Sequence, residues 1–369
     1  MSIETNFDIG FISQIALKEK QIQQNYRPLI AIHKWFARRP GTLFRGLVIS
    51  EFGESSVKES FFQNNAYPGR TIADPFMGGG TPLMEANRVG CDIHGFDINP
   101  MSAWIVREEL EEIDLAKYDE ECSRILDNLE SDLGHLYKTD CIIYGTREVP
   151  VKYFLWVKTL DCRQCKTKFD LFPNYRIAAA GRHPRHVIVC SQCGELNECA
   201  STSNPGKCVS CHAAIQVQGP AKRGKCACPS CGTVNTYPRQ QEGPLSHRLF
   251  AIEYYNPEYS GQHHGRFFKR PDQKDLTKID EARKVASRNA LDYCPIQQIM
   301  EGDETTRLLR WGYKKYSELF SARQLYSLNE ICRRVSAVND ERIRHALATN
   351  LSDLTRGSCR KTDYKAPIT

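Results

Sequence analysis

The sequence predicts an α/β fold in its first part, followed by a cysteine-rich metal-binding region and a helical segment. Three observations support this division. A glycine-rich stretch, "ADPFMGGGT" (73–81), lies between a strand-like and a helix-like pattern. Four C-x-x-C pairs occur between residues 162 and 231. From about Asp272 the apolar residues return to helical spacing, with 321–335 as the clearest amphipathic run.

Length and composition set the broad class. The 369 residues suffice for two or three domains, and the composition is ordinary, with 41% hydrophobic and 25% charged residues. No run approaches the roughly 20 apolar residues of a transmembrane helix, and the N-terminal stretch lacks the layout of a secretory signal. We therefore expect a cytoplasmic protein without membrane segments. The net charge of +6 permits a polyanionic partner without requiring one.

The glycine stretch can be interpreted residue by residue. Residues 71–73 are expected to end a short strand, and the three glycines at 78–80 allow a tight turn and close approach of a ligand to the backbone. Thr81 is a good N-cap and Pro82 suits the first helical position. Gly90 is suited to the helix C-terminus.

A second strand is expected at 91–98, with Asp97 near its carboxyl end. An acidic residue about twenty positions after such a loop is placed to accept hydrogen bonds from ribose hydroxyls. The stretch is not a P-loop, because G-x-x-x-x-G-K-[ST] is absent, and its consecutive glycines fit G-x-G-x-x-G poorly. The alternative is a plain glycine turn in a βαβ unit.

The C-x-x-C pairs predict two closed metal sites. The first two pairs are separated by 24 residues (166–189) and the last two by 16 (212–227), which favours pairing in chain order. Four thiolates leave no open position, so Zn²⁺ would be structural, with an iron–sulfur cluster as a minor alternative. The expected ligands are Cys162, Cys165, Cys190 and Cys193 in one site and Cys208, Cys211, Cys228 and Cys231 in the other.

Some details of the cysteine region stay open. Cys226 competes with Cys228 as a ligand, and Cys199 and His212 are spare. The basic loops "GRHPRH" (181–186) and "AKRGK" (221–225) could contact a nucleic-acid backbone. We expect the metal centres mainly to staple a segment with little core of its own.

Three motifs carry a resemblance to a known family. "DPFMGGGT" (74–81) resembles the D-P-F-x-G-x-G-T loop with which DNA amino-methyltransferases, acting on adenine N6 or cytosine N4, bind S-adenosylmethionine. "FDINP" (96–100) is similar to the acidic motif that follows it, and 32–52 to the helix that precedes it. Over residues 25–355 the chain resembles the adenine-specific DNA methylases that contain a zinc ribbon, a group often associated with phage defence.

The resemblance implies a partial Rossmann-like S-adenosylmethionine methyltransferase domain over 1–150. It further implies a tandem zinc-ribbon insertion over 151–245 and a connecting strand with a helical segment over 246–369. A cation from the 33–39 stretch would lie near the cofactor carboxylate or a DNA phosphate, and the alternative for this stretch is a solvated helix start with one buried tryptophan. The implied cofactor-binding residues are Asp74, Phe76, Gly78, Gly80, Thr81, Asp97, His33 and Lys34.

The second motif of these enzymes, [D/N/S]-P-P-[Y/F/W], does not occur in the chain. Its polar residue holds the target amine and its aromatic residue stacks on the flipped base. The nearest stretch is "NPEY", in which Asn256 and Tyr259 are weak catalytic candidates, and a surface turn is the favoured interpretation.

We therefore expect the cofactor-binding subunit, or N-terminal part, of a DNA adenine-N6 methyltransferase that acts on double-stranded DNA with a second chain supplying the missing motif. The chain ends shortly after the helical region that precedes the motif in the family, which leaves open a split subunit, a truncated frame or a fragment. Two alternatives are a self-sufficient enzyme using Asn256 and a non-catalytic nucleic-acid or protein-binding module. RNA as the substrate also stays open.

Overall fold

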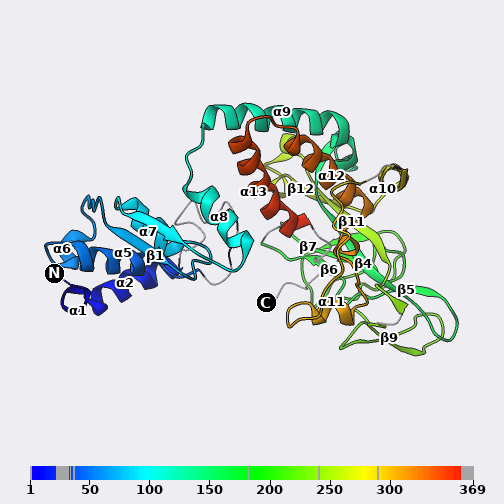
Figure 1. Cartoon of the computed structure of the whole chain (residues 1–369). Helices are drawn as coiled ribbons and strands as arrows, with labels where there is room; N and C mark the ends of the chain where they lie inside the picture. Colours follow the sequence, from blue (N-terminus) through cyan, green and yellow to red (C-terminus); the bar gives the residue numbers. More distant parts are fainter. Residues whose placement is uncertain are drawn as a thin grey trace. The chain divides into compact units, whose positions relative to one another are not determined.

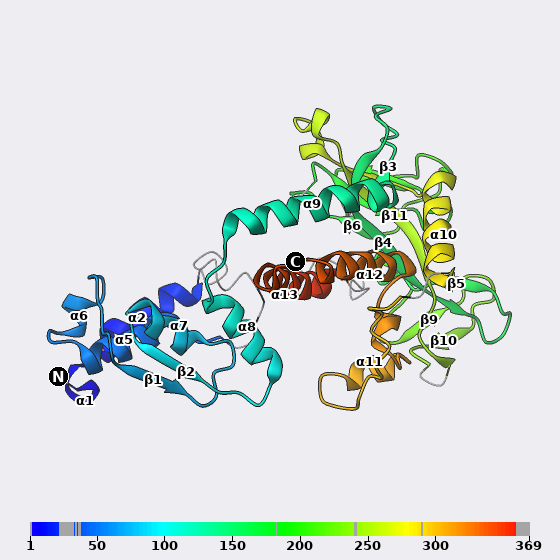
Figure 2. The same ribbon diagram turned by 45° about the horizontal axis from the view of Figure 1, so that its top comes forward.

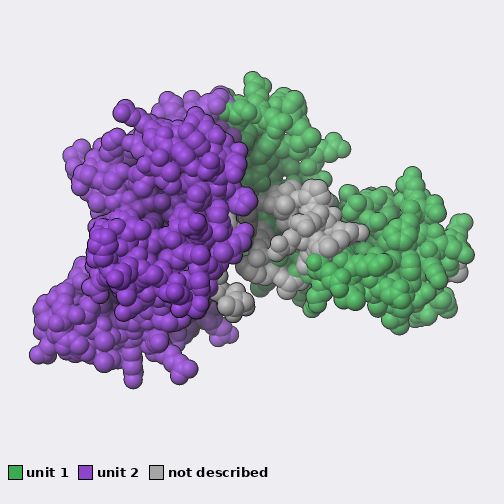
Figure 3. Space-filling view, turned by 180° about the vertical axis from the view of Figure 1, so that it is seen from behind, with its two compact units in different colours: residues 1–123, 335–357 green, residues 124–334, 358–369 purple. Residues whose placement is uncertain are grey.

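The computed structural model describes residues 2–21, 33, 35, 38–181, 183–239, 242–288 and 291–358 (Figure 1, and turned in Figure 2). It is a mixed α/β structure whose contacts divide the chain into two compact units, coloured separately in Figure 3. Unit 1 comprises residues 1–123 and 335–357, and unit 2 comprises 124–334 and 358–369. In the described part of the chain, no helix is both long and apolar enough to cross a membrane.

Unit 1 is built on one βαβ unit. Strand β1 (Thr71–Asp74) runs parallel to β2 (Asp92–Gly95), and helix α7 (Thr81–Arg88) connects them. The other helices of this unit are α1 (Ile3–Asn6), α2 (Ile9–Gln21), α5 (Gly41–Phe52), α6 (Val57–Ser60), α8 (Pro100–Leu110) and α13 (Glu341–Ser358).

The apolar side chains of the two strands decide which face of this small sheet is covered. Ile72 and Ile93 pack with Val48 of α5 and Ala86 of α7, so both helices lie on the same face, as Figure 2 shows. On the other face Ala73 and His94 are exposed. Because β1 and β2 are parallel, their carboxyl ends meet at the same edge of the sheet. Ligands bind at this edge in open α/β sheets.

Unit 2 contains antiparallel sheets. The main sheet has the order β12–β11–β4–β3, and β5 pairs with the end of β4. A second sheet has the order β6–β7–β8, and β9 pairs with β10. The strands are β3 (Lys138–Thr139), β4 (Val149–Asp161), β5 (Lys168–Asp170), β6 (Arg176–Ala178), β7 (His186–Val189), β8 (Leu196–Cys199), β9 (Lys225–Ala227), β10 (Val234–Thr236), β11 (His247–Tyr255) and β12 (Arg266–Lys269).

Helices cover one face of the main sheet. Leu249 and Ile252 of β11 pack with Ile279 of α10, and the buried guanidinium of Arg323 on α12 lies 3.4 Å from the ring centroid of Phe154. The helical elements associated with this unit are α9 (Leu115–Leu133), η1 (Gly134–Tyr137), η3 (Pro257–Tyr259), η4 (His263–Gly265), α10 (Gln273–Arg288), α11 (Thr306–Arg310), η5 (Tyr316–Leu319) and α12 (Ala322–Ser336).

The helix expected at 321–335 is confirmed as α12. One local expectation is wrong. Gly80, in a left-handed conformation (φ 70°), caps α7, and Thr81 is already its first residue. Between α8 and α9, Asp114 accepts hydrogen bonds from the backbone N–H groups of Ala116 and Lys117 and so caps the start of α9.

Candidate functional site

The glycine loop after β1 is shaped by its own packing. Gly78 and Gly80 adopt positive φ values of 50° and 70°, which disfavour other residues. A Cβ at Gly79 would lie 2.9 Å from Cγ of Trp35, and one at Gly80 would lie 2.6 Å from a methyl group of Val106. The three glycines are therefore needed for the loop to fit against the indole of Trp35 and against α8, before any ligand is considered.

Asp97 braces the loop from the end of β2. Its Oδ2 accepts a hydrogen bond from the Gly78 N–H at 2.9 Å, and its Oδ1 accepts one from the Asn99 N–H at 2.8 Å. These two backbone hydrogen bonds lower the pKa of the Asp97 carboxyl group, and the one from Asn99 has the larger effect. The hydroxyl group of Ser102 donates to the Gly78 carbonyl group. Asp97 thus tethers the loop to the start of α8.

Arg38 holds the loop from the other side. Its guanidinium donates to the Gly79 carbonyl oxygen at 2.6 Å and forms an ion pair with Glu109, and both charged side chains are buried. Burial raises the pKa of Glu109, while the hydrogen bond from Arg38 opposes that rise. Because Arg38 is already committed to these two groups, it is a structural clamp.

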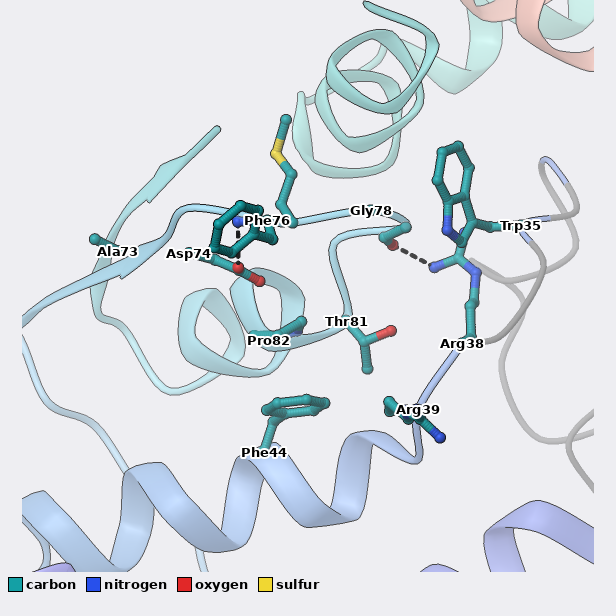
Figure 4. A pocket seen from close by; sticks show the side chains of 12 residues that line it. Trp35, Arg38, Arg39, Phe44, Ala73, Asp74, Phe76, Gly78, Thr81 and Pro82 are labelled. Atoms are coloured by element: carbon teal, nitrogen blue, oxygen red, sulfur yellow. Dashed lines mark hydrogen bonds between the residues drawn. The ribbon is translucent and has the colours of Figure 1, made fainter. Parts of the chain in front are cut away.

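The braced loop borders a pocket of about 530 Å³, within the range typical of small-molecule sites. In Figure 4, Asp74 and Phe76 lie across the pocket from Arg39 and Phe44. The ring of Phe76 is 86% exposed. Arg39 is exposed and has no hydrogen-bond or ion-pair partner among the described residues. The lining residues are Trp35, Arg38, Arg39, Phe44, Ala73, Asp74, Phe76, Met77, Gly78, Gly79, Thr81 and Pro82.

The sequence-predicted cofactor residues divide into three groups. Asp74, Phe76, Gly78 and Thr81 line the pocket, and the Asp74 carboxylate also accepts a hydrogen bond from the Phe76 N–H at 3.0 Å. Gly80 and Asp97 shape and brace the loop without lining the pocket. His33 Nε2 lies 3.1 Å from the hydroxyl oxygen of Ser352 on α13, and Lys34 is outside the described residues.

Unit 2 brings together all eight expected cysteine ligands, but in a different pairing from the one expected. The first C-x-x-C pair joins the fourth, and the second joins the third. The β9–β10 hairpin packs back on the end of β4 through an apolar cluster that includes Leu160, Phe169 and Ala221, which brings the fourth pair to the first. The second and third pairs, only 14 residues apart (194–207), close the inner site. Chain-order pairing is therefore wrong.

All four C-x-x-C turns share one backbone geometry. The residue after the second cysteine has positive φ, and its N–H donates to the carbonyl oxygen of the first cysteine. This turn aims both sulfur atoms at one point. The residues concerned, with their N–O distances, are Lys166 (3.1 Å), Gly194 (2.9 Å), His212 (3.0 Å) and Gly232 (2.9 Å).

The sulfur atoms are spaced as a tetrahedral zinc site requires. Cys162 and Cys231 are 3.6 Å apart, as are Cys190 and Cys211. Zinc–sulfur bonds of about 2.3 Å place tetrahedral ligands about 3.8 Å apart. In the outer site the backbone N–H of Cys165 is the main cause that lowers the pKa of Cys162 to about 6, which favours a thiolate at neutral pH. Both four-cysteine sites could therefore bind Zn²⁺.

One buried asparagine links the two turns of each site, and neither asparagine was predicted from the sequence. Oδ1 of Asn235 accepts from the N–H of Arg163 at 2.9 Å, and Oδ1 of Asn197 accepts from the N–H of Val209 at 2.8 Å. Each asparagine lies four residues after its second cysteine, in "CSQCGELN" and "CPSCGTVN". This repeated C-x-x-C-G-x-x-N pattern is the sequence signal from which the two asparagines could have been predicted.

The spare candidates take other roles. Cys228 belongs to the outer site, while Cys226 is buried in the adjoining apolar cluster, where burial raises its pKa to about 11. Cys199 is buried in a separate apolar cluster of unit 2. His212 occupies the left-handed position of its turn, so its backbone rather than its ring serves the metal site.

A groove of about 1240 Å³ runs beside both cysteine sites. Residues of two turns, including Gln192 and Pro229, contribute to its wall. Two of its carboxylates are paired, Asp170 with Arg248 and Asp280 with Arg283. Positively charged side chains outnumber the two carboxylates in the lining, and they are Lys168, Lys222, Arg248, Arg270 and Arg283.

The "NPEY" stretch has a structural role. Asn256 is fully buried, so the expected surface turn is wrong at this residue. Its Nδ2 donates to Thr146 at 3.0 Å and its Oδ1 accepts from the Glu258 N–H at 3.3 Å. Tyr259 stacks on Tyr144 with ring centroids 3.7 Å apart. Both polar ends of the Asn256 amide are thus engaged within the protein.

Comparison with known proteins adds no relative: no family model, curated protein or solved structure matches this chain.

Proposed function

We propose that unit 1 binds S-adenosylmethionine in the glycine-loop pocket and that the chain is the cofactor-binding part of a DNA adenine-N6 methyltransferase. The observation that carries this proposal is the loop "DPFMGGGT" with its pocket. The pocket offers an exposed aromatic ring (Phe76), a carboxylate (Asp74) and an exposed cation (Arg39) that has no ion-pair partner among the described residues. These groups complement the adenine ring, the polar hydrogens and the carboxylate of the cofactor.

The βαβ unit is compatible with part of a Rossmann-like sheet. Its loop lies at the carboxyl ends of β1 and β2, as a nucleoside ligand requires in that fold. In the proposed complex, Phe76 stacks on adenine and Arg39 pairs with the methionine carboxylate. Asp97 contributes by fixing the Gly78 backbone, and any ribose contact would use its remaining lone pairs.

A second chain supplies the amine-holding residues in this proposal. The [D/N/S]-P-P-[Y/F/W] motif is absent from the 369 residues, and both ends of the Asn256 amide already have partners. This supports a two-chain enzyme over a self-sufficient one. The proposed setting is that of the resembling family, phage defence in the cytoplasm.

Duplex DNA is the proposed substrate, held in part by the groove of unit 2. Lys168, Lys222 and Arg270 line the groove and have no ion-pair partner among the described residues. Such cations contact phosphates without reading sequence. The same groove favours a second candidate function, a zinc-stapled nucleic-acid-binding module that transfers no methyl group.

Transfer of labelled methyl groups from S-adenosylmethionine to duplex DNA tests the proposal. The zinc-loaded chain is assayed alone and again with the product of the adjacent gene. Activity only in the mixture supports the two-chain enzyme. Activity of the chain alone, lost in Asn256→Ala, would replace it with the self-sufficient enzyme. DNA binding without transfer in either case would favour the binding module.

A further inference from the structure

A third cluster of metal-ligating side chains lies in unit 2, apart from the eight cysteine ligands. His183, Glu198 and His263 place one ligand atom each within 4.8 Å of the others. Nε2 of His263 is 3.2 Å from Oε1 of Glu198, and Nε2 of His183 is 3.7 Å from the same oxygen. His183 lies in the basic loop 181–186, and neither the methyltransferase motifs nor the cysteine sites account for this cluster.

His183 is oriented as a metal ligand. Its side chain is 2% exposed, and its Nδ1 lies 3.0 Å from the carbonyl oxygen of Arg185. Because a carbonyl oxygen only accepts, this 3.0 Å contact requires the proton on Nδ1, and Nε2 then presents a lone pair toward Glu198 and His263. The longer approach of the Arg185 N–H to Nδ1, at 3.5 Å, belongs to the other tautomer. Nε2 is buried and has no hydrogen-bond partner in the described part of the chain. A backbone carbonyl that fixes the imidazole tautomer in this way is typical of metal-bound histidines.

The surrounding structure holds the two imidazole rings in place. The ring centroids of His183 and His263 are 5.0 Å apart. Phe268 packs edge-on against His183 at 5.5 Å, and Phe267 packs against His263 at 5.2 Å. Both phenylalanines belong to β12, whereas Glu198 belongs to β8. The cluster thus joins the two antiparallel sheets of unit 2.

One member of the cluster, Glu198, lies on a hairpin that also carries a cysteine turn. Strands β7 and β8 hold Cys190 and Cys193 at the turn between them, while Glu198 lies opposite Val187 toward the other end. Three residues along a strand span about 10 Å, so the two sites are separate and share one rigid hairpin.

We propose that His183, Glu198 and His263 form a third metal site, which takes a divalent transition metal such as Zn²⁺ through two imidazole Nε2 atoms and one carboxylate. Metal–nitrogen and metal–oxygen bonds of about 2.0–2.1 Å place tetrahedral ligands about 3.3 Å apart. The two observed histidine–carboxylate distances, 3.2 and 3.7 Å, are close to this value. The two imidazole nitrogens lie within 4.8 Å of each other, so metal binding would draw the rings closer together.

Three protein ligands leave at least one coordination position to water or an anionic ligand. The side chains of Glu198 and His263 are 38% and 24% exposed, so this position faces accessible space. The site therefore differs in kind from the two closed cysteine sites, and it does not depend on the proposed methyltransferase activity.

Metal titration of the whole chain tests this site. The protein is first loaded with two equivalents of Co²⁺, whose bonds to the cysteine sulfurs give near-ultraviolet charge-transfer absorption, and is then titrated with further Co²⁺. We expect a third equivalent that adds visible d–d absorption without additional sulfur charge transfer. In parallel, elemental analysis after Zn²⁺ loading is expected to find three zinc ions per chain.

Ligand variants make the assignment specific. Glu198→Gln and His263→Asn are expected to bind two zinc ions and to lose the third cobalt signal. His264→Asn is the matched control, because His264 neighbours His263, shares its positive φ and lies outside the cluster; asparagine tolerates that conformation, and three ions are expected. Wild-type protein that stops at two ions, or ligand variants that retain the third, would overturn the site.

Discussion

At the scale of single residues, the charged groups expected to contact a cofactor mostly hold the protein together. Asp97 accepts two backbone hydrogen bonds, and Arg38 clamps the Gly79 carbonyl oxygen against Glu109. The sequence placed Asp97 correctly beside the loop, since glycine spacing and the following strand define that position. It could not show which donors reach the carboxylate, because these depend on the backbone path of residues 97–99.

Asp97→Asn is expected to weaken binding of S-adenosylmethionine by about tenfold. An amide NH₂ would replace one acceptor oxygen, so the N–H of Gly78 or of Asn99 would lose its partner and the loop would be held less firmly. The pKa of Asp97 is lowered in the folded protein. The hydrogen bonds of its carboxylate therefore stabilise the loop fully above the ordinary carboxyl pKa of about 3.9, and this stabilisation is lost as the pH falls through the lower pKa of the folded state.

The affinity of the wild-type protein should therefore not vary between pH 5 and pH 8 through this group, and calorimetry at both values checks it. A pH dependence across that window that disappears in Asp97→Asn would show that the carboxylate titrates there. It would contradict the brace as described.

At the scale of elements, the four C-x-x-C turns show what spacing can and cannot predict. Their residue types identified all eight candidate ligands, since the turn is local and needs only two cysteines followed by a residue that adopts positive φ. Pairing is a property of the tertiary fold. It depends on the β9–β10 hairpin packing on the end of β4 through Leu160 and Phe169, which no local pattern records.

Double substitutions distinguish the nested pairing from pairing in chain order. Cys165→Ser/Cys231→Ser is expected to remove one thiolate-bound metal, because both residues belong to the outer site. Cys165→Ser/Cys193→Ser should remove both, since it damages each site once. Sulfur-to-cobalt charge-transfer absorption counts these ions, and the opposite result for the two variants would restore the chain-order pairing.

At the scale of the whole molecule, the sequence predicted a mixed α/β chain with an inserted metal region. The βαβ unit followed from strand, glycine and helix signals within about 25 residues. The basic groove could not be predicted, because Lys168, Lys222 and Arg270 are far apart in the sequence and meet only when the strands and α10 pack together. Long-range packing likewise assembles His183, Glu198 and His263.

Lys222→Gln/Arg270→Gln is expected to weaken binding to duplex DNA and to make it less dependent on salt. Each lost phosphate contact lowers the slope of log K against log salt concentration by about 0.9. Fluorescence anisotropy over a salt series measures this slope. Lys152→Gln, an exposed lysine on β4 outside the groove, is the matched control and should leave the slope unchanged. Equal slopes for the wild type, the double variant and the control variant would show that the groove does not contact DNA.

The central claim is that the glycine-loop pocket holds S-adenosylmethionine, and calorimetric titration of the zinc-loaded chain tests it most directly. We expect saturable one-to-one binding that weakens about tenfold in Phe76→Ala and in Arg39→Ala. The exposed residues Phe62 and Lys58 lie in the same unit outside the pocket, so Phe62→Ala and Lys58→Ala should bind as the wild type does. No binding by folded, zinc-loaded protein, or equal effects of pocket and control variants, would contradict the claim.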